Sequence, residues 1–177
     1  MQTYIALLRG INVSGQKLIK MADLKVYLSE LKFSNIRTYI QSGNIVFEAS
    51  DSDEIALAKL IENKIAEKYQ FEVPTMIRTQ QEILDVIARN PLEIDEQNDF
   101  SKPYVIFLEN EPAIELVEKV MVFNSDKEVF QIIGREVFIQ YKNGAGTTKL
   151  TNTFFESKLK TKATSRNWNT VNKLSSF

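Results

Sequence analysis

The second half of the chain repeats the order of predicted strands and helices of the first half, and this repetition constrains the fold more than any other feature. In the first half, hydrophobic periodicity and turn residues predict a helix over 21–32, a second helix capped by Asp51 or Ser52, and strands over 4–8, 36–41, 45–48 and 73–78. The tripeptide Ser42-Gly43-Asn44 predicts a tight hairpin, because glycine accepts positive φ. Residues 1–78 therefore follow the order βαββαβ.

The same order is predicted for the second half. Its elements are a strand over 104–108, a helix from Pro112 to about Val122, hairpin strands over 128–133 and 136–141, a helix over 149–160 and a short strand over 163–166. A last helix begins near Trp168, with Asn167 as its cap. We therefore predict an α+β fold of two duplicated βαββαβ units, ferredoxin-like and of the split-βαβ type, each with an antiparallel sheet.

Between the two predicted units lies a connecting segment. Thr79 and Glu82 form a capping-box pattern that opens a helix with Ile83, Leu84 and Ile87 turned inward. Asn90-Pro91 ends this helix, and the chain is then acidic and irregular as far as Pro103. We predict a first unit over 1–78, a connecting helix and acidic linker over 79–103, and a second unit with a C-terminal helix over 104–177.

The chain contains no cysteine and no histidine, and these two absences exclude several kinds of chemistry. They rule out a disulfide, a thiolate or imidazole metal site, a cysteine nucleophile and a histidine general base. No paired acids fall in a recognisable motif, so we predict no metal site, although a magnesium ion bound by carboxylates stays open. Whether the protein is an enzyme, and which cofactor it uses, is not determined by the sequence.

The net charge of −1 hides an uneven distribution along the chain. Residues 1–47 hold six basic and two acidic residues, and residues 142–177 hold seven basic residues and one acidic residue. The segment between them is strongly acidic, with nine basic and twenty acidic residues. If the two ends meet in space they form one basic surface. The alternative is that these lysines lie on separate solvated helix faces.

Two regions near the N-terminus are candidates for a binding site. Aligning the halves places nine extra residues in the first, and the polar loop over 9–20 is the obvious position for them. The side chains of this loop that could bind an anion are Arg9, Asn12 and Lys20. The hairpin that follows adds Gln41, Ser42 and Asn44.

Two further candidates lie near the C-terminus. In residues 142–152 a strand runs into a glycine-containing loop and then into a helix start, which favours an anion held by Lys149, Thr151 and Asn152. The spacing is not that of a P-loop, and a flexible loop with hydroxyl caps is the alternative. In the last candidate, Arg166 and Asn167 precede Trp168, the only tryptophan of the chain. We expect Trp168 to be a core or inter-domain anchor rather than a stacking platform.

Four stretches of the chain together resemble one family. They are residues 6–13 (ALLRGINV), 38–47 (TYIQSGNIVF), 149–152 (KLTN) and 163–174 (ATSRNWNTVNKL). On these stretches the chain resembles the domain-of-unknown-function 1697 family of small, mostly bacterial proteins, and the resemblance covers nearly the whole chain. It departs mildly at Ser14, where many members have glycine, and near Thr148, where many have serine. The resemblance implies a two-part α+β fold built from duplicated units and brings no established activity, substrate or cofactor.

The leading hypothesis is that the protein binds a phosphorylated or otherwise anionic small molecule, such as a nucleotide. In this hypothesis the loops of the two ends converge on one pocket. One alternative is a nucleic-acid-associated protein that uses the same basic face. It is disfavoured because the hairpins lack the RNA-recognition signature, so that Tyr39, Phe47, Phe130 and Phe138 are expected to be core. The other is an enzyme that acts on a phosphorylated substrate without histidine or cysteine.

The partners and location follow from the same observations. The apolar run near the N-terminus is about five residues long, too short for a signal-peptide core or a membrane span. We therefore expect no membrane partner and a cytoplasmic protein. The sequence makes no prediction of the oligomeric state.

Overall fold

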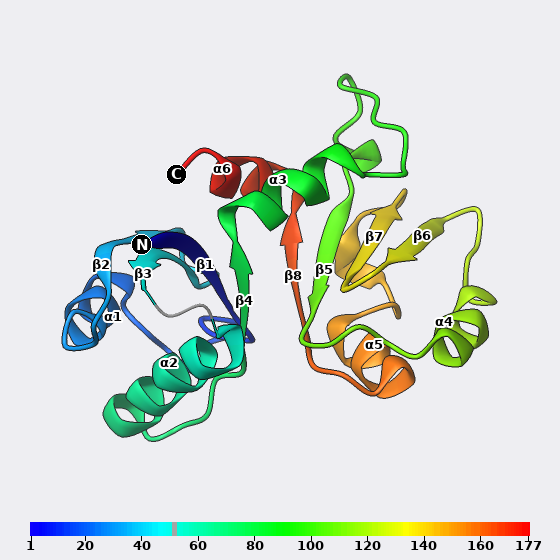
Figure 1. Ribbon diagram of the computed structural model, residues 1–177. Helices are drawn as coiled ribbons and strands as arrows, with labels where there is room; N and C mark the ends of the chain where they lie inside the picture. Colours follow the sequence, from blue (N-terminus) through cyan, green and yellow to red (C-terminus); the bar gives the residue numbers. More distant parts are fainter. Residues whose placement is uncertain (51–52) are drawn as a thin grey trace. The chain divides into compact units, whose positions relative to one another are not determined.

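Two apolar segments of the sequence each become one of the two inner strands of a four-stranded sheet (Figure 1). They are β1 (Gln2–Leu8) and β5 (Tyr104–Leu108). The computed structural model describes residues 1–50 and 53–177, and these divide into two units. Unit 1 comprises Met1–Leu84 and Leu174–Phe177, and unit 2 comprises Asp85–Lys173.

Unit 1 has the strand order β2-β3-β1-β4, with every neighbouring pair antiparallel. Its elements are α1 (Met21–Leu28), β2 (Ser34–Tyr39), β3 (Asn44–Ala49), α2 (Glu54–Tyr69) and β4 (Thr75–Thr79). Alternate residues of β1, including Tyr4 and Leu8, pack with Phe47 and with Ile61 of α2 in one core. Ile5 and Leu7, on the opposite face of the sheet, are also fully buried, as the unbroken apolar run of β1 leads one to expect.

Unit 2 repeats this topology, with the strand order β6-β7-β5-β8 and antiparallel pairing throughout. Its elements are α4 (Ile114–Met121), β6 (Glu128–Ile133), β7 (Glu136–Tyr141), α5 (Asn152–Leu159) and β8 (Ala163–Asn167), with short 3-10 helices over Asp99–Ser101 and Ala145–Thr147. The prediction of an α+β fold with two duplicated, ferredoxin-like units is therefore confirmed.

The repetition also includes a helix after the last strand of each sheet. The helix α3 (Gln80–Ala88) follows β4 directly, and α6 (Trp168–Ser175) follows β8 directly. Thr79 and Glu82 form the predicted reciprocal capping box, with backbone-to-side-chain distances of 2.8 and 3.1 Å. The Asn167 side chain caps α6 as predicted, accepting from the Thr170 N–H at 2.8 Å. The helix predicted as part of a connecting segment is thus the counterpart of the C-terminal helix, and the division between the two units falls within α3 and α6.

Several predicted helix boundaries are wrong. Helix α1 ends at Leu28 rather than at residue 32, because the Glu30 and Leu31 N–H groups bond three residues back in turns. Pro112 lies before the N-cap residue Ala113 instead of opening α4. Helix α5 begins at Asn152 rather than at 149, because the Thr151 hydroxyl accepts from the Phe154 N–H and caps the helix there.

Two further details concern α2 and α3. Asp53 is the N-cap of α2, accepting from the N–H groups of Ile55 and Ala56. Asp51 and Ser52, the predicted caps, lie outside the described residues. In α3, Ile83 is buried as predicted, but Val86 is buried in place of Leu84, which is 43% exposed.

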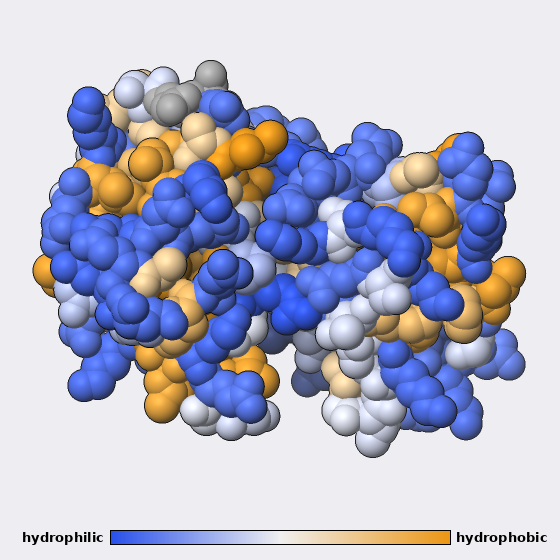
Figure 2. Space-filling model, turned by 90° about the horizontal axis from the view of Figure 1, so that it is seen from below, coloured by the Kyte–Doolittle hydropathy of each residue, from blue (hydrophilic) through white to orange (hydrophobic). Residues whose placement is uncertain are grey.

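The surface of both units carries apolar side chains as well as polar ones. Figure 2 shows hydrophobic side chains in separate patches among hydrophilic ones on one face. The most exposed large apolar residues of the helices are Ile55 of α2, Val26 of α1 and Ile114 of α4. Across residues 1–50 and 53–177, no helix has both the length and the apolar character that crossing a bilayer requires.

The β2–β3 hairpin depends on the glycine in its turn. Gly43 has φ +83°, and its carbonyl accepts from the Leu8 N–H at 2.8 Å. A Cβ placed on Gly43 would lie 2.8 Å from both Leu8 Cβ and Ile11 Cδ1, which are buried. Glycine is therefore required here both for the backbone conformation and for the close approach of β1 to the turn.

We predict that Gly43→Ala lowers the free energy of unfolding by about 2–4 kcal/mol, because it adds an atomic overlap to the cost of a positive φ. Gly15→Ala is the matched control, since Gly15 has φ +75° but no atom within 4 Å of the position that a Cβ would take. It should cost only about 1 kcal/mol. Urea unfolding of both variants measures the difference, and equal losses would contradict the role of close packing.

Candidate functional site

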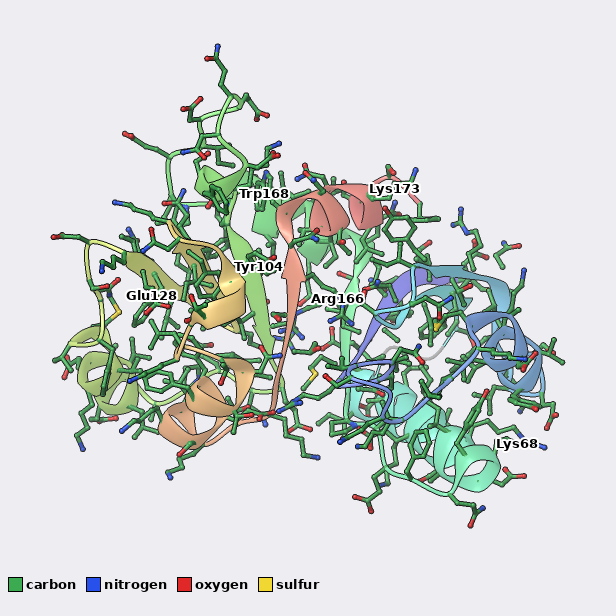
Figure 3. All side chains as sticks on the ribbon, turned by 180° about the vertical axis from the view of Figure 1, so that it is seen from behind. Lys68, Tyr104, Glu128, Arg166, Trp168 and Lys173 are labelled. Atoms are coloured by element: carbon green, nitrogen blue, oxygen red, sulfur yellow. The ribbon has the colours of Figure 1, made fainter. Side chains whose placement is uncertain are left out.

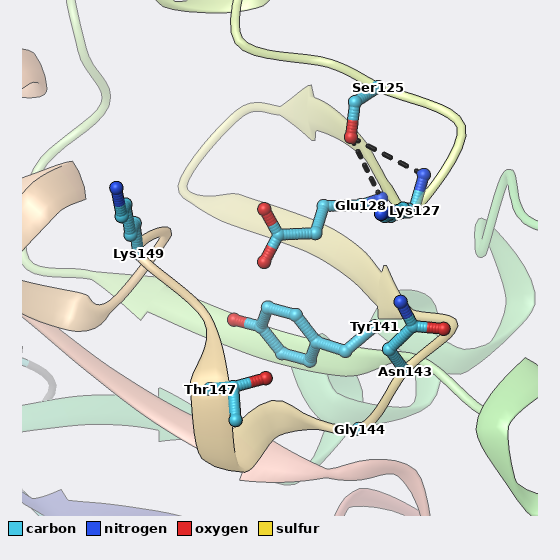
Figure 4. A pocket seen from close by; sticks show the side chains of 8 residues that line it. All are labelled: Ser125, Lys127, Glu128, Tyr141, Asn143, Gly144, Thr147 and Lys149. Carbon is cyan, nitrogen blue, oxygen red and sulfur yellow. Dashed lines mark hydrogen bonds between the residues drawn. The ribbon is translucent and has the colours of Figure 1, made fainter.

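A cavity of about 340 Å³ opens in unit 2 beside the end of β7 (Figure 4). The side chains that line it come from the start of β6, the end of β7 and the glycine-containing loop that follows. These residues are Ser125, Lys127, Glu128, Tyr141, Asn143, Gly144, Thr147 and Lys149. The cavity therefore lies where the sequence predicted an anion-binding loop.

The loop after β7 is folded back beside β6 by main-chain hydrogen bonds. The Lys142 N–H donates to the Lys127 carbonyl at 3.0 Å, and the Gly144 N–H donates to the Tyr141 carbonyl at 2.8 Å. Gly144 has φ +81°, a conformation that glycine adopts without cost. Thr147 of the 3-10 helix over Ala145–Thr147, and Lys149 in the segment that leads into α5, then complete one wall of the cavity.

The opposite wall is set by a turn at the start of β6. The Ser125 hydroxyl accepts from the N–H groups of Lys127 at 3.3 Å and Glu128 at 3.1 Å, as Figure 4 shows. The Ser125 N–H in turn donates to the Glu128 carbonyl at 3.0 Å. Because Glu128 pairs with Tyr141 in the β6–β7 ladder, both side chains face the same cavity.

The Glu128 carboxylate is held by the loop on the other side of the cavity. One of its oxygens, Oε1, accepts a short hydrogen bond from the Thr148 hydroxyl. The same hydroxyl accepts from the Leu150 N–H at 2.9 Å, so it links the carboxylate to the segment that leads into α5. The second carboxylate oxygen has no hydrogen-bond partner among the described residues.

Tyr141 forms the floor of the cavity and is 7% exposed. Its hydroxyl donates to the Leu150 carbonyl at 3.0 Å. Burial raises the pKa of Tyr141 above its ordinary value, and the nearby charges of Glu128 and of ionised Tyr104 add to this effect. Tyr141 is therefore a neutral phenol at physiological pH and acts as a hydrogen-bond donor, not as a general base.

Two cations stand at the edge of this cavity. Lys127 and Lys149 are exposed, and within the described part of the chain neither ammonium group has a carboxylate partner. The Asn143 amide and the Thr147 hydroxyl are likewise without partners in that part of the chain. No group of three or more acidic side chains that could hold a metal ion is found in residues 1–50 and 53–177. The arrangement is suited to hydrogen bonding and to attraction of negative charge.

The residues predicted near the C-terminus all lie in unit 2, but only Lys149 lines the cavity. Thr151 is the N-cap of α5, and Asn152 is the first residue of that helix. The Asn152 Oδ1 atom is buried and has no hydrogen-bond partner in the described structure.

Arg166 and its neighbours have structural partners. Arg166 lies on β8 and is buried (Figure 3). Its Nη1 atom donates to the Thr164 hydroxyl at 2.9 Å and to the Ser165 carbonyl at 2.7 Å, and desolvation lowers its pKa to about 9. Arg78 occupies the corresponding place on β4 and donates to the Ile77 carbonyl at 2.8 Å, so the buried arginine belongs to the repeat. Trp168 is 9% exposed, in keeping with a role in packing.

The candidates near the N-terminus all lie in unit 1, where amide side chains hold the loop over 9–20 to the hairpin. Asn12 donates to the carbonyls of Ile19 at 3.0 Å and Gln41 at 2.9 Å, and its Oδ1 atom accepts from the Ile19 N–H at 2.8 Å. Asn44 is fully buried and donates to the Tyr39 carbonyl and the Ser42 hydroxyl at 2.9 and 3.1 Å. The structure thus gives Asn12, Asn44 and Ser42 internal partners.

The remaining candidates of unit 1 are partly or fully exposed. Lys20 and Gln41 are exposed, and Arg9 is half-buried, with its main-chain N–H donating to the Pro74 carbonyl at 2.9 Å. The predicted site residues are therefore divided between the two units. Their convergence on one pocket stays a prediction.

The sequence analysis missed four residues of the cavity, which are Ser125, Lys127, Glu128 and Tyr141. All four lie in the acidic segment between the basic ends, where no site was expected. Their place was nevertheless available from strand register, since a two-residue turn at Gly134 and Arg135 sets Glu128 opposite Tyr141. By contrast, the expectation that Phe47, Phe130 and Phe138 are core is confirmed by exposures of 1% or less. The same expectation is wrong for Tyr39, which is only half-buried at the end of β2.

Comparison with known proteins bears on the family and the fold. The family of proteins of unknown function designated DUF1697 matches residues 1–138, which confirms the resemblance noted in the sequence. The structure of a conserved bacterial protein, SP0830 from Streptococcus pneumoniae, is similar with a TM-score of 0.76 and 22% identity, over 99% of this chain and 97% of that one. At this identity the similarity shows the fold alone. None of the curated proteins matches the chain.

The raised pKa of Tyr141 predicts how the stability of the protein changes at alkaline pH. Because the unfolded chain loses this proton near pH 10 while the folded protein keeps it, the free energy of unfolding should fall as the pH rises above about 10. Tyrosinate absorbance should show a last ionisation phase well above that of free tyrosine, and Tyr141→Phe should remove it. If the variant instead loses a phase of ordinary pKa, Tyr141 is not desolvated as described.

Proposed function

We infer that the chain, which belongs to the DUF1697 family of proteins of unknown function, binds a small phosphorylated or otherwise anionic molecule in the cavity of unit 2. The observation that carries this proposal is the pair of lysines, Lys127 and Lys149, that line one cavity without carboxylate partners in the described chain. A cation already paired with a carboxylate would gain little from a ligand, whereas these two can form charge-assisted hydrogen bonds with an oxyanion.

The neutral groups of the cavity support the same proposal. The Asn143 amide and the Thr147 hydroxyl can each donate a hydrogen bond to a ligand. A volume of about 340 Å³ lies at the lower end of the range for small-molecule pockets. The proposed ligand is therefore a compact one.

The two alternatives are less well supported by the side chains. An RNA-recognition surface needs aromatic rings exposed on the sheet, and the aromatic side chains of β3, β6 and β7 that could serve are buried. Turnover would need a general base; burial keeps Tyr141 protonated, and the Glu128 carboxylate is the group of this cavity lining that could accept a proton. We therefore propose binding as the primary activity and keep the cytoplasmic location as part of the proposal.

Calorimetric titration with ethyl phosphate at low ionic strength tests this function. Lys127→Ala and Lys149→Ala should each weaken binding by roughly five- to tenfold, because each removes one charged hydrogen bond. Lys142→Ala is the matched control, since this lysine is exposed on the same loop but does not line the cavity. Its effect should be less than twofold, because it acts only at long range.

Two outcomes would overturn the proposal. One is that ethyl phosphate, inorganic phosphate and ribose 5-phosphate all fail to bind the unaltered protein. The other is that Lys142→Ala weakens binding as much as Lys149→Ala, which would show a diffuse effect of net charge and not a site.

A further inference from the structure

The cavity proposed to bind an anion contains one feature that a simple anion site lacks, which is the carboxylate of Glu128. In Figure 4 this group lies over the Tyr141 ring, with Lys149 on one side and Asn143 on the other. No ion pair joins it to either lysine of the cavity in the described structure. In the described structure, no cation in contact with this carboxylate balances it beside the place where an anion would be held.

Hydrogen bonds hold both the main chain and the carboxylate of Glu128. Its main-chain N–H is bonded to the Ser125 hydroxyl at 3.1 Å, and its backbone pairs with Tyr141 across the ladder. Its Oε1 atom is bonded to the Thr148 hydroxyl, which itself accepts from the Leu150 N–H. A carboxylate held in this way does not swing out of the cavity when a ligand enters.

The second oxygen of Glu128, Oε2, is left as an acceptor with no donor in the described chain. An ionised carboxylate can only accept hydrogen bonds, so a group that satisfies this oxygen must be a donor. A phosphate ion without hydroxylated carbon atoms is anionic at neutral pH, so it is a poor hydrogen-bond donor to Glu128 Oε2 and is repelled by the carboxylate. A hydroxyl carried beside the phosphate satisfies it and removes the desolvation cost.

We propose that the cavity selects phosphate monoesters of hydroxylated compounds, and that Glu128 is the residue that recognises the hydroxyl. This inference rests on the proposed function, because Lys127 and Lys149 must first hold the phosphate. The Asn143 amide and the Thr147 hydroxyl, both unpartnered in the described structure, are placed to bind further hydroxyls. The Tyr141 hydroxyl is occupied by the Leu150 carbonyl, so this residue presents its ring to the ligand's carbon atoms.

This chemistry is shared by free sugar phosphates and by the ribose phosphate part of nucleotides. Both carry hydroxyls on carbon atoms near the phosphate. The residues of the cavity do not favour sugar phosphates over nucleotides, or the reverse. Adding a nucleotide to the experiment separates the two sources, because only a nucleotide can gain from contacts made by a base.

The experiment compares ribose 5-phosphate with ethyl phosphate, which lacks the hydroxyls, by calorimetric titration of the full chain and of Glu128→Gln. The unaltered protein should prefer ribose 5-phosphate by about tenfold, the usual effect of one hydrogen bond to a charged group. Glu128→Gln keeps an acceptor for the Thr148 hydroxyl, so the wall of the cavity is retained. It should lose most of the preference and bind ethyl phosphate more tightly than the unaltered protein does, because the repulsion is gone.

The opposite effects on the two ligands distinguish recognition from a general structural role, which would weaken both. Equal affinity of the unaltered protein for the two ligands, or a preference that survives Glu128→Gln, would overturn the inference and leave the proposed function standing. Failure of both ligands to bind would instead overturn the proposed function itself. Adenosine 5′-monophosphate is the third ligand: tighter binding than ribose 5-phosphate assigns the site to nucleotides, and equal binding assigns it to sugar phosphates.

Discussion

Each unit depends on an inner strand whose side chains are buried on both faces of its sheet. β1 and β5 hydrogen-bond to a neighbour on each side and pack apolar side chains above and below the sheet. Such a strand has no room for polar chemistry, because an unpaired polar group there would be desolvated. Groups that could bind a ligand are consequently confined to strand ends and to the loops between strands and helices, where the cavity of unit 2 lies.

The same constraint explains how much of the molecule the sequence predicted. Some local patterns favour a single local structure. The apolar run that ends at Leu8 forms a strand, the turn at Gly134 forms a hairpin, and Thr79 caps a helix, each as predicted. Helix ends were predicted less well. Helix α1 ends at Leu28 and α5 begins after Thr151 because of the particular carbonyl or hydroxyl that each nearby N–H group bonds to. Hydrophobic periodicity does not determine these hydrogen bonds.

For the site, the amide residues show what a sequence leaves undecided. Asn12 satisfies both main-chain groups of Ile19, and Asn44 holds its own turn together. In sequence alone, an asparagine that binds backbone and an asparagine that binds a ligand are the same residue in the same kind of glycine-containing loop. Lys127 and Glu128 present the opposite case, since nothing in their local sequence marks them and only the pairing with β7 brings them to the cavity.

The central claim is that the ligand site lies in unit 2, between the start of β6 and the loop after β7. The most direct measurement is the change in backbone amide chemical shifts when ethyl phosphate is added to the isotope-labelled protein. A site in this place predicts shifts that saturate with ligand and are concentrated in residues 125–128 and 141–150. Saturating shifts confined to the loop over 9–20 and its hairpin, with residues 141–150 unchanged, would contradict it.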